Sequence, residues 1–231
     1  MFGLSFATTI LALLGASTSA ASPLERRACP SIEIIDARGT TTPQGSTSGY
    51  TGMLTQARNA LGAASYSVNY PASIDFYNSI QAGVNDLRNH IFNGVTFCPN
   101  QKYAFIGYSQ GAEVMNNYLQ NVNSTSNANI YNLIKAIVYI GNPSHSPYNP
   151  SNFDQNGGKL TDPYIGGGIG GFRTPPLTPY INSGKLHDIC YTQDIICAVN
   201  STNASLDAHL QYDTSTSVQN QGASFIISKF T

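Results

Sequence analysis

The pentapeptide Gly107-Tyr108-Ser109-Gln110-Gly111 constrains the fold more than any other stretch of this 231-residue chain. It follows an apolar run that predicts a strand over 102–107 and precedes a pattern that predicts a helix over 112–119. A G-x-S-x-G sequence in such a setting is typical of a turn so tight that bulky neighbours of the serine would clash. This turn pushes the serine oxygen clear of the sheet, which makes Ser109 a candidate nucleophile.

Strand and helix patterns alternate along the rest of the chain. Further strands are predicted over 31–37, 66–70 and 133–140, and further helices over 49–61, 74–92 and 217–230. This alternation indicates an α/β fold, a three-layer α/β/α sandwich around a central, mainly parallel sheet.

The sequence predicts one long helix with a single buried face and one long segment without regular structure. The 74–92 helix should bury one face, formed by Ile74, Ile80, Val84, Leu87 and Ile91. Between 142 and 184 the pattern lapses into Pro, Gly and Asn, with five glycines in 166–171, and no regular element is predicted there. No strand precedes this glycine run and no helix follows it, so it is not a dinucleotide fingerprint, and its role stays open.

The N-terminus is typical of a secreted protein. Residues 1–20 combine an apolar stretch with small residues at the end and predict a signal peptide. Residues 21–27 end in Arg26-Arg27 and indicate a short propeptide, which leaves 28–231 as one domain. We therefore expect an extracellular protein.

Charge and apolar patterning argue against nucleic acid as a partner and against a membrane span. Charged residues make up 10% of the chain and the formal net charge is −1, so no basic stripe is available for nucleic acid. No other apolar run is long enough to span a membrane. We expect a monomer that needs neither a metal nor an organic cofactor.

Four cysteines remain after the predicted leader, and an even count in a secreted protein favours two disulfides. Three pairings are possible. We favour Cys29 with Cys98, which would tie the N-terminus to the body, and Cys190 with Cys197, which are close enough to pin one loop. The spacing does not match a structural zinc site.

A serine nucleophile needs a histidine base and an acid that orients it. His90 precedes the serine and does not fit the chain order Ser, acid, His, whereas His145 and His187 read as surface histidines. His209 is favoured, because it comes last and follows the loop 190–197, which offers Asp194 as the acid. Asp207 is a rival acid, but it lies only two positions before His209, which would strain the geometry.

The chain resembles the cutinase and acetylxylan esterase family of small serine esterases. The resemblance is carried by five segments that span nearly the whole mature chain. They are Ala37-Arg38-Gly39-Thr40-Thr41, Asn69-Tyr70-Pro71-Ala72, Gly107-Tyr108-Ser109-Gln110-Gly111-Ala112, Asp194-Ile195-Ile196-Cys197 and His209-Leu210-Gln211-Tyr212.

The resemblance implies an α/β-hydrolase fold with Ser109 as nucleophile, His209 as base and Asp194 as its orienting acid. It places the oxyanion hole at Thr40 and at the backbone amide of Gln110, and it implies the cysteine pairing favoured above. These roles agree with the residues themselves, because the amide of Gln110 would open a helix, where the dipole favours negative charge.

One segment departs from the lipid-facing pattern of cutinases. Residues 198–208 before the histidine are mostly polar and carry the sequons of Asn200 and Asn203; a third sequon begins at Asn123. We expect hydrolysis of carboxylic esters through an acyl-enzyme, on cutin-type or short-chain esters. Two alternatives stay open, an acetylxylan esterase acting on acetylated plant polysaccharide and a secreted binding protein on the same fold that does not turn over.

Overall fold

The computed structural model describes residues 29–171 and 173–231. The predicted signal peptide and propeptide lie outside these residues. Six strands form one sheet in the order β2-β1-β3-β4-β6-β5, and every neighbouring pair is parallel. The strands are β1 Ile32–Ala37, β2 Ala64–Ser67, β3 Lys102–Tyr108, β4 Ile134–Ile140, β5 Asn152–Asp154 and β6 Leu186–Cys190.

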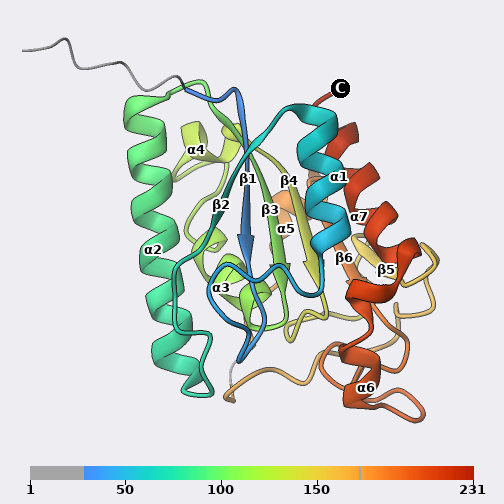
Figure 1. The fold of residues 1–231 in the computed structure, drawn as a ribbon. Helices are drawn as coiled ribbons and strands as arrows, with labels where there is room; N and C mark the ends of the chain where they lie inside the picture. Colours follow the sequence, from blue (N-terminus) through green and yellow to red (C-terminus); the bar gives the residue numbers. More distant parts are fainter. Residues whose placement is uncertain (1–28, 172) are drawn as a thin grey trace, which may run out of the picture.

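Helices cover both faces of this sheet (Figure 1). They are α1 Thr51–Leu61, α2 Phe76–Phe97, α3 Gln110–Leu119, α4 Ala128–Leu133, α5 Thr178–Asn182, α6 Leu206–His209 and α7 Thr216–Ser228, with a 3₁₀ turn at Tyr212–Thr214. The predicted α/β sandwich with a parallel sheet is therefore confirmed.

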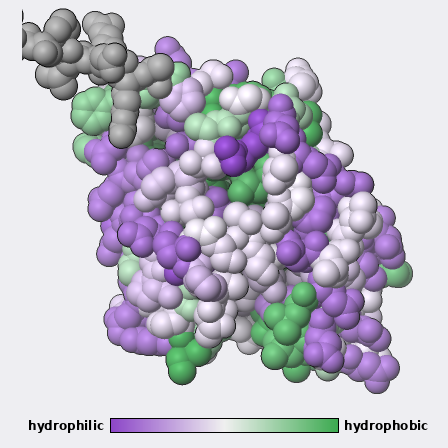
Figure 2. All heavy atoms as spheres, in the orientation of Figure 1, coloured by the Kyte–Doolittle hydropathy of each residue, from purple (hydrophilic) through white to green (hydrophobic). Residues whose placement is uncertain are grey.

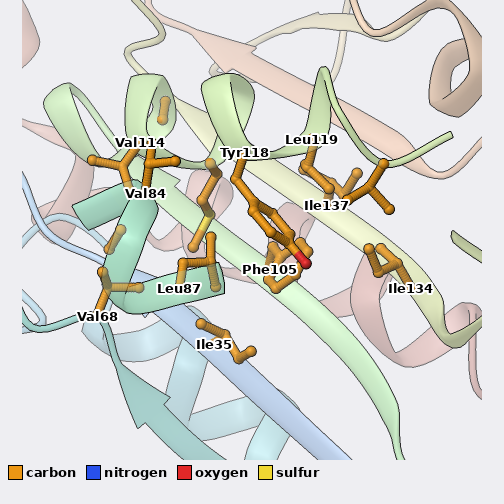
Figure 3. Close-up of a cluster of buried hydrophobic side chains, with 14 of the residues drawn as sticks. Ile35, Val68, Val84, Leu87, Phe105, Val114, Tyr118, Leu119, Ile134 and Ile137 are labelled. Carbon is orange, nitrogen blue, oxygen red and sulfur yellow. The ribbon is translucent and has the colours of Figure 1, made fainter. Parts of the chain in front are cut away.

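Two apolar cores hold the layers together, because successive strand residues point to opposite faces of the sheet. Ile35 and Phe105 pack under α2 and α3, as Figure 3 shows. Their neighbours Ile34 and Ile106 pack against α1 and α7 on the other face. Both faces are thus buried, which explains why the central strands read as continuous apolar runs.

Several predicted boundaries were wrong. The strand expected over 66–70 is β2 at Ala64–Ser67, and the helix expected over 74–92 is α2 at Phe76–Phe97. Asp75 caps α2, so Ile74 precedes the helix and is 76% exposed instead of buried. The segment 142–184 holds the short elements β5 and α5 and is therefore not wholly irregular.

The sequence analysis also missed strand β6. Its sequence, LHDIC, places His187 and Asp188 inside a strand that is buried throughout. Asp188 accepts hydrogen bonds from Asn142 and His145, and the ring of His187 lies between those of Phe153 and Phe225. Polar residues with such partners can occupy a central strand, but they interrupt the apolar pattern that predicts one.

His187 should make stability depend on pH. Burial lowers the pKa of His187 from 6.5 to about 4, although a 2.8 Å hydrogen bond to Gln221 raises it in part. The unfolded chain therefore takes up a proton that the folded protein does not bind. We expect the free energy of unfolding to fall by about 3 kcal/mol as the pH falls from about 6.5 to about 4.

Urea unfolding at about pH 7 and about pH 4 tests this prediction with the His187→Phe variant as comparison. The variant should lose about 3 kcal/mol less than the parent between the two conditions. Burial raises the pKa of Asp36 to about 6, which works in the opposite direction, but this effect is common to both proteins and cancels in the difference. Equal losses would contradict the role of His187.

Candidate active site

Ser109 lies in the turn between β3 and α3, at φ 54° and ψ −119°. Few residues other than glycine adopt a positive φ, so the surrounding structure must impose this conformation. A Cβ on Gly107 would lie 2.7 Å from Cα of Ala112, and one on Gly111 would lie 2.0 Å from the carbonyl oxygen of Ala37. Both flanking glycines are therefore needed for the turn.

The structure brings together the three residues expected to act as a triad. Nε2 of His209 lies 2.9 Å from Oγ of Ser109, and Nδ1 of the same ring lies 2.8 Å from Oδ2 of Asp194. All three residues are at least 94% buried, so the hydrogen bonds between them are shielded from water. Ser109 is itself only 6% exposed, because the loops around the turn cover most of it.

Three donors fix the carboxylate of Asp194. Its Oδ2 accepts hydrogen bonds from His209 and, at 2.6 Å, from the hydroxyl of Tyr212, while its Oδ1 accepts from the amide of Ile196 at 2.7 Å. Burial and the nearby Asp194 raise the pKa of Tyr212 well above 10, so the phenol stays a donor. The carboxylate therefore has one orientation in which it can hold the imidazole.

Sequence reasoning assigned no role to Tyr212. Its hydroxyl donates to Asp194 and accepts a 3.0 Å hydrogen bond from the amide of Tyr191. The only signal in the sequence is its place three residues after His209, which does not reveal that its side chain points back to the acid.

Tyr212→Phe should lower kcat about tenfold, because the acid keeps its charge but loses one of the donors that orient it. Tyr180→Phe is a matched control, since Tyr180 is also fully buried and donates at 2.7 Å to the carbonyl of Val122 in the α2–α3 core. Both variants should lose similar stability in thermal unfolding, but only Tyr212→Phe should lose kcat. An equal kcat in both would exclude this positioning role.

The imidazole of His209 is held on its other sides as well. The ring of Tyr108 stacks on it with centroids 5.2 Å apart, and the Tyr108 hydroxyl donates to the His209 carbonyl at 2.7 Å. Gly141, at the end of β4, leaves room for the ring, because a Cβ there would lie 2.7 Å from Cε1 of His209.

Thr40 and Gln110, the residues expected to form an oxyanion hole, are linked to each other by a side-chain hydrogen bond. Gln110 is the first residue of α3, where backbone amides have no partner within the helix. Its buried side chain donates to Oγ1 of Thr40 at 3.4 Å and to the carbonyl of Ser73 at 2.8 Å, and it accepts from Ser79 at 2.8 Å. The loop that carries Thr40 is thereby fixed against the beginning of α2.

The remaining candidates for the base lie elsewhere. His90 pairs with Glu33, and His145 pairs with Asp188 at 3.1 Å. His145 and His187 were expected at the surface, but they are 0% and 6% exposed, because each has a buried hydrogen-bond partner. Asp207, the rival acid, is exposed, and it is Asp194 that lies within hydrogen-bond distance of His209.

Both expected disulfides are present. Cys29 is bonded to Cys98, and Cys190 to Cys197. The second bond closes a ring of eight residues around Asp194, whose amide also donates to Tyr191 and whose carbonyl accepts from Ala198. The acid is therefore held by its backbone as well as by its side chain.

Within 29–171 and 173–231, no group of three or more His, Cys, Asp or Glu side chains is arranged to hold a metal ion. None of the helices in the same ranges is both long and apolar enough to cross a membrane.

The hydrogen-bond chain from serine to histidine to aspartate lies at the carboxyl end of a parallel sheet, with the serine in a strained turn between strand and helix. That arrangement defines the α/β-hydrolase class, in its serine hydrolase form.

Comparison with known proteins gives the family. The family model described as Cutinase matches residues 28–230, so the chain belongs to the cutinase family. It is 26% identical to "Cutinase 11" of Verticillium dahliae over 85% of this chain and 70% of that protein. It is 27% identical to "Acetylxylan esterase 2" of Talaromyces purpureogenus over 60% of this chain and 67% of that protein.

A solved structure agrees with this assignment. A cutinase-like protein from Cryptococcus sp. superposes with a TM-score of 0.78 at 32% identity, over 87% of this chain and 96% of that one. These relatives carry names of ester hydrolases, and the chain is a carboxylic ester hydrolase of this family. The resemblance and the activity class expected from the sequence are therefore confirmed.

Proposed function

We propose that Ser109 is the nucleophile of this ester hydrolase, that His209 is its general base and that Asp194 orients the base. The observation that carries the proposal is the unbroken hydrogen-bond chain from Oγ of Ser109 through both nitrogens of His209 to Oδ2 of Asp194. A rigid, buried chain of this kind lets the imidazole accept the serine proton as the oxygen attacks.

The reaction then follows in two halves. Oγ of Ser109 attacks the ester carbonyl carbon, and its proton passes to Nε2 of His209. The amides of Thr40 and Gln110 stabilise the oxyanion, after which His209 protonates the departing alcohol and an acyl-enzyme remains. Water, activated by the same histidine, releases the acid and restores Ser109.

For the substrate, we propose an ester with an aliphatic chain. Large apolar residues are exposed on the segments around the site, and Figure 2 shows two groups of hydrophobic residues at this end of the molecule. They are Ile74 (76% exposed), Ile195 (38%), Val199 (43%), Leu206 (56%) and Leu210 (64%). The segment 198–208 is polar in composition, but it exposes the large apolar side chains of Val199 and Leu206, which supports cutin-type esters.

Acetylated polysaccharide is the second candidate. Asn200, Thr202 and Asn203 are exposed on the same loop and can hydrogen-bond to sugar hydroxyls. A panel of p-nitrophenyl esters of rising chain length, run beside acetylated xylan, separates the candidates. We expect kcat/KM to rise from the acetate to the octanoate ester, with slow release of acetate from xylan. Fast deacetylation of xylan without activity on the longer ester would overturn this choice of substrate.

We further propose a secreted, monomeric, single-domain protein whose mature chain begins near residue 28. The match of the family model to 28–230 and the two disulfides support this, since disulfides persist in oxidising compartments. Asn200 and Asn203 are exposed and Asn123 is half-buried, which supports glycosylation at these sequons.

A further inference from the structure

The glycine-rich segment 165–171, which we call the strap, has no part in the chemistry proposed above. In Figure 1 it runs along the carboxyl end of the sheet from near α6 toward the beginning of α2. We propose that the strap is the wall against which the non-reacting chain of the substrate lies, and that it sets the preference for acyl chain length. This inference rests on the proposed function.

One end of the strap is bonded to the loop that carries Asp194. The amide of Gly167 donates to the carbonyl of Ile196 at 2.8 Å, and that of Val199 donates to the carbonyl of Ile165 at 3.0 Å. The side chain of Asn200 accepts from the amide of Ile165 at 3.0 Å. Exposed Val199 and Ile195 therefore stand directly beside Gly167, which is itself exposed.

The middle of the strap lies on the segment that follows β4. The amides of Gly166 and Gly168 donate to the carbonyls of His145 and Pro143, each at 2.9 Å. A Cβ on Gly166 would lie 2.2 Å from the Pro143 oxygen, so only glycine permits this approach. Gly141, two residues before Pro143, lies beside the ring of His209, so the segment on which the strap rests leads directly to the site.

The other end of the strap meets the beginning of α2. A Cβ on Gly170 would lie 2.9 Å from Cβ of Phe76, and both Phe76 and Ile169 pack against the α2–α3 core. Ser73 and Ser79, which flank Phe76 in sequence, bind the side chain of Gln110. The strap therefore connects the loop that carries Asp194 to the beginning of α2, the helix that binds the side chain of Gln110.

In this proposal, a chain that leaves the ester carbonyl on the β4 side passes along the strap. Its exposed glycines, at 167, 170 and 171, carry no side chains, so an extended aliphatic chain can lie flat between Val199 at one end and the α2 end at the other. The acetyl group of an acetate ester is too short to reach beyond Ser109 and should not sense the strap.

The first test is Gly167→Lys, with Gly167→Ala as matched control. A Cβ at this position meets the Ile195 carbonyl and Val199 at 3.7 Å, an ordinary contact, so the backbone tolerates a side chain. The lysine places a charge and four methylenes on the wall, whereas alanine adds only a methyl group. We expect Gly167→Lys to lower kcat/KM for p-nitrophenyl octanoate about tenfold and to leave the acetate ester within about twofold. Gly167→Ala, which adds only one methyl group to the wall, should lower the octanoate value far less, by under about twofold.

A second pair of variants tests the end of the strap that meets α2. Gly170 and Gly171 both have positive φ, so alanine costs similar backbone strain at each, but only at Gly170 does the methyl meet Phe76. Gly170→Ala should displace the strap and lower the octanoate-to-acetate ratio of kcat/KM roughly fivefold, whereas Gly171→Ala, whose methyl group meets no neighbouring atom, should lower it by less than about twofold.

The outcomes are distinct. If Gly167→Lys changes neither ester, or lowers both equally, the strap does not bind the substrate chain and the inference is overturned. If the parent protein hydrolyses neither ester, the proposed function fails instead.

Discussion

Replacing Ser109 with alanine should lower kcat for ester hydrolysis by about a thousandfold or more while leaving the fold intact. The hydroxyl is the group expected to form the acyl-enzyme, so its removal takes away the covalent route. Alanine keeps the Cβ, so the strain of the turn at φ 54° is unchanged, and the one lost hydrogen bond is that to His209. The free energy of unfolding should therefore change by less than about 1 kcal/mol.

Ester hydrolysis and urea unfolding of the same preparation check both halves of this prediction. Ser228→Ala is the control, because its hydroxyl is exposed at the end of α7 and bonds only locally, to the Phe225 carbonyl. Retention of more than about a tenth of the activity in Ser109→Ala would remove Ser109 from the mechanism.

Asp194→Asn should cost about a thousandfold in kcat, although the side chain keeps its size. Every partner of this carboxylate is a donor, so an amide nitrogen fits neither oxygen position. At Oδ2 it would face Nδ1 of His209 and favour the wrong tautomer, and at Oδ1 it would oppose the amide of Ile196.

Asp207→Asn is the matched control for this variant. The change is the same, the residue lies two positions from His209, and its side chain is exposed. We expect Asp207→Asn to keep full kcat. If instead Asp207→Asn lost activity and Asp194→Asn kept it, the acid of the triad would have been wrongly assigned.

The features of the fold and the site that could be predicted from the sequence depend on local constraints. The turn around Ser109 is set by five consecutive residues, and the ring of Cys190 and Cys197 by eight, so both could be recognised without knowing the fold. The central strands were recognisable because both faces of the sheet are buried, which gives unbroken apolar runs.

The parts that were missed depend on partners far along the chain. Strand β6 contains His187 and Asp188, whose burial is compensated by hydrogen bonds with Gln221 and His145. No local sequence pattern predicts these partners. The role of Tyr212 likewise depends on the folded structure, which places its hydroxyl against the carboxylate of Asp194. Ile74 fits the helical pattern, but Asp75 caps the helix after it and leaves it exposed.

The function of the strap was also invisible in the sequence. Its glycines exclude a regular element, but their role depends on which atoms lie within a few ångströms of the position that a Cβ would occupy. Gly166 approaches Pro143 and Gly170 approaches Phe76, and these segments are distant in the chain. Composition alone therefore indicated an irregular loop and nothing more.

The central claim, that Ser109 forms a covalent acyl-enzyme, is tested most directly by capture with a fluorophosphonate, which reacts with serines that a histidine activates. Mass spectrometry of the intact protein and of its peptides should find one phosphonyl group per chain, attached to Ser109, with loss of activity in proportion to labelling. Asp194→Asn should label far more slowly, and Ser109→Ala should not label. A protein that stays unlabelled while it hydrolyses esters, or that carries the label on another residue, would contradict the account.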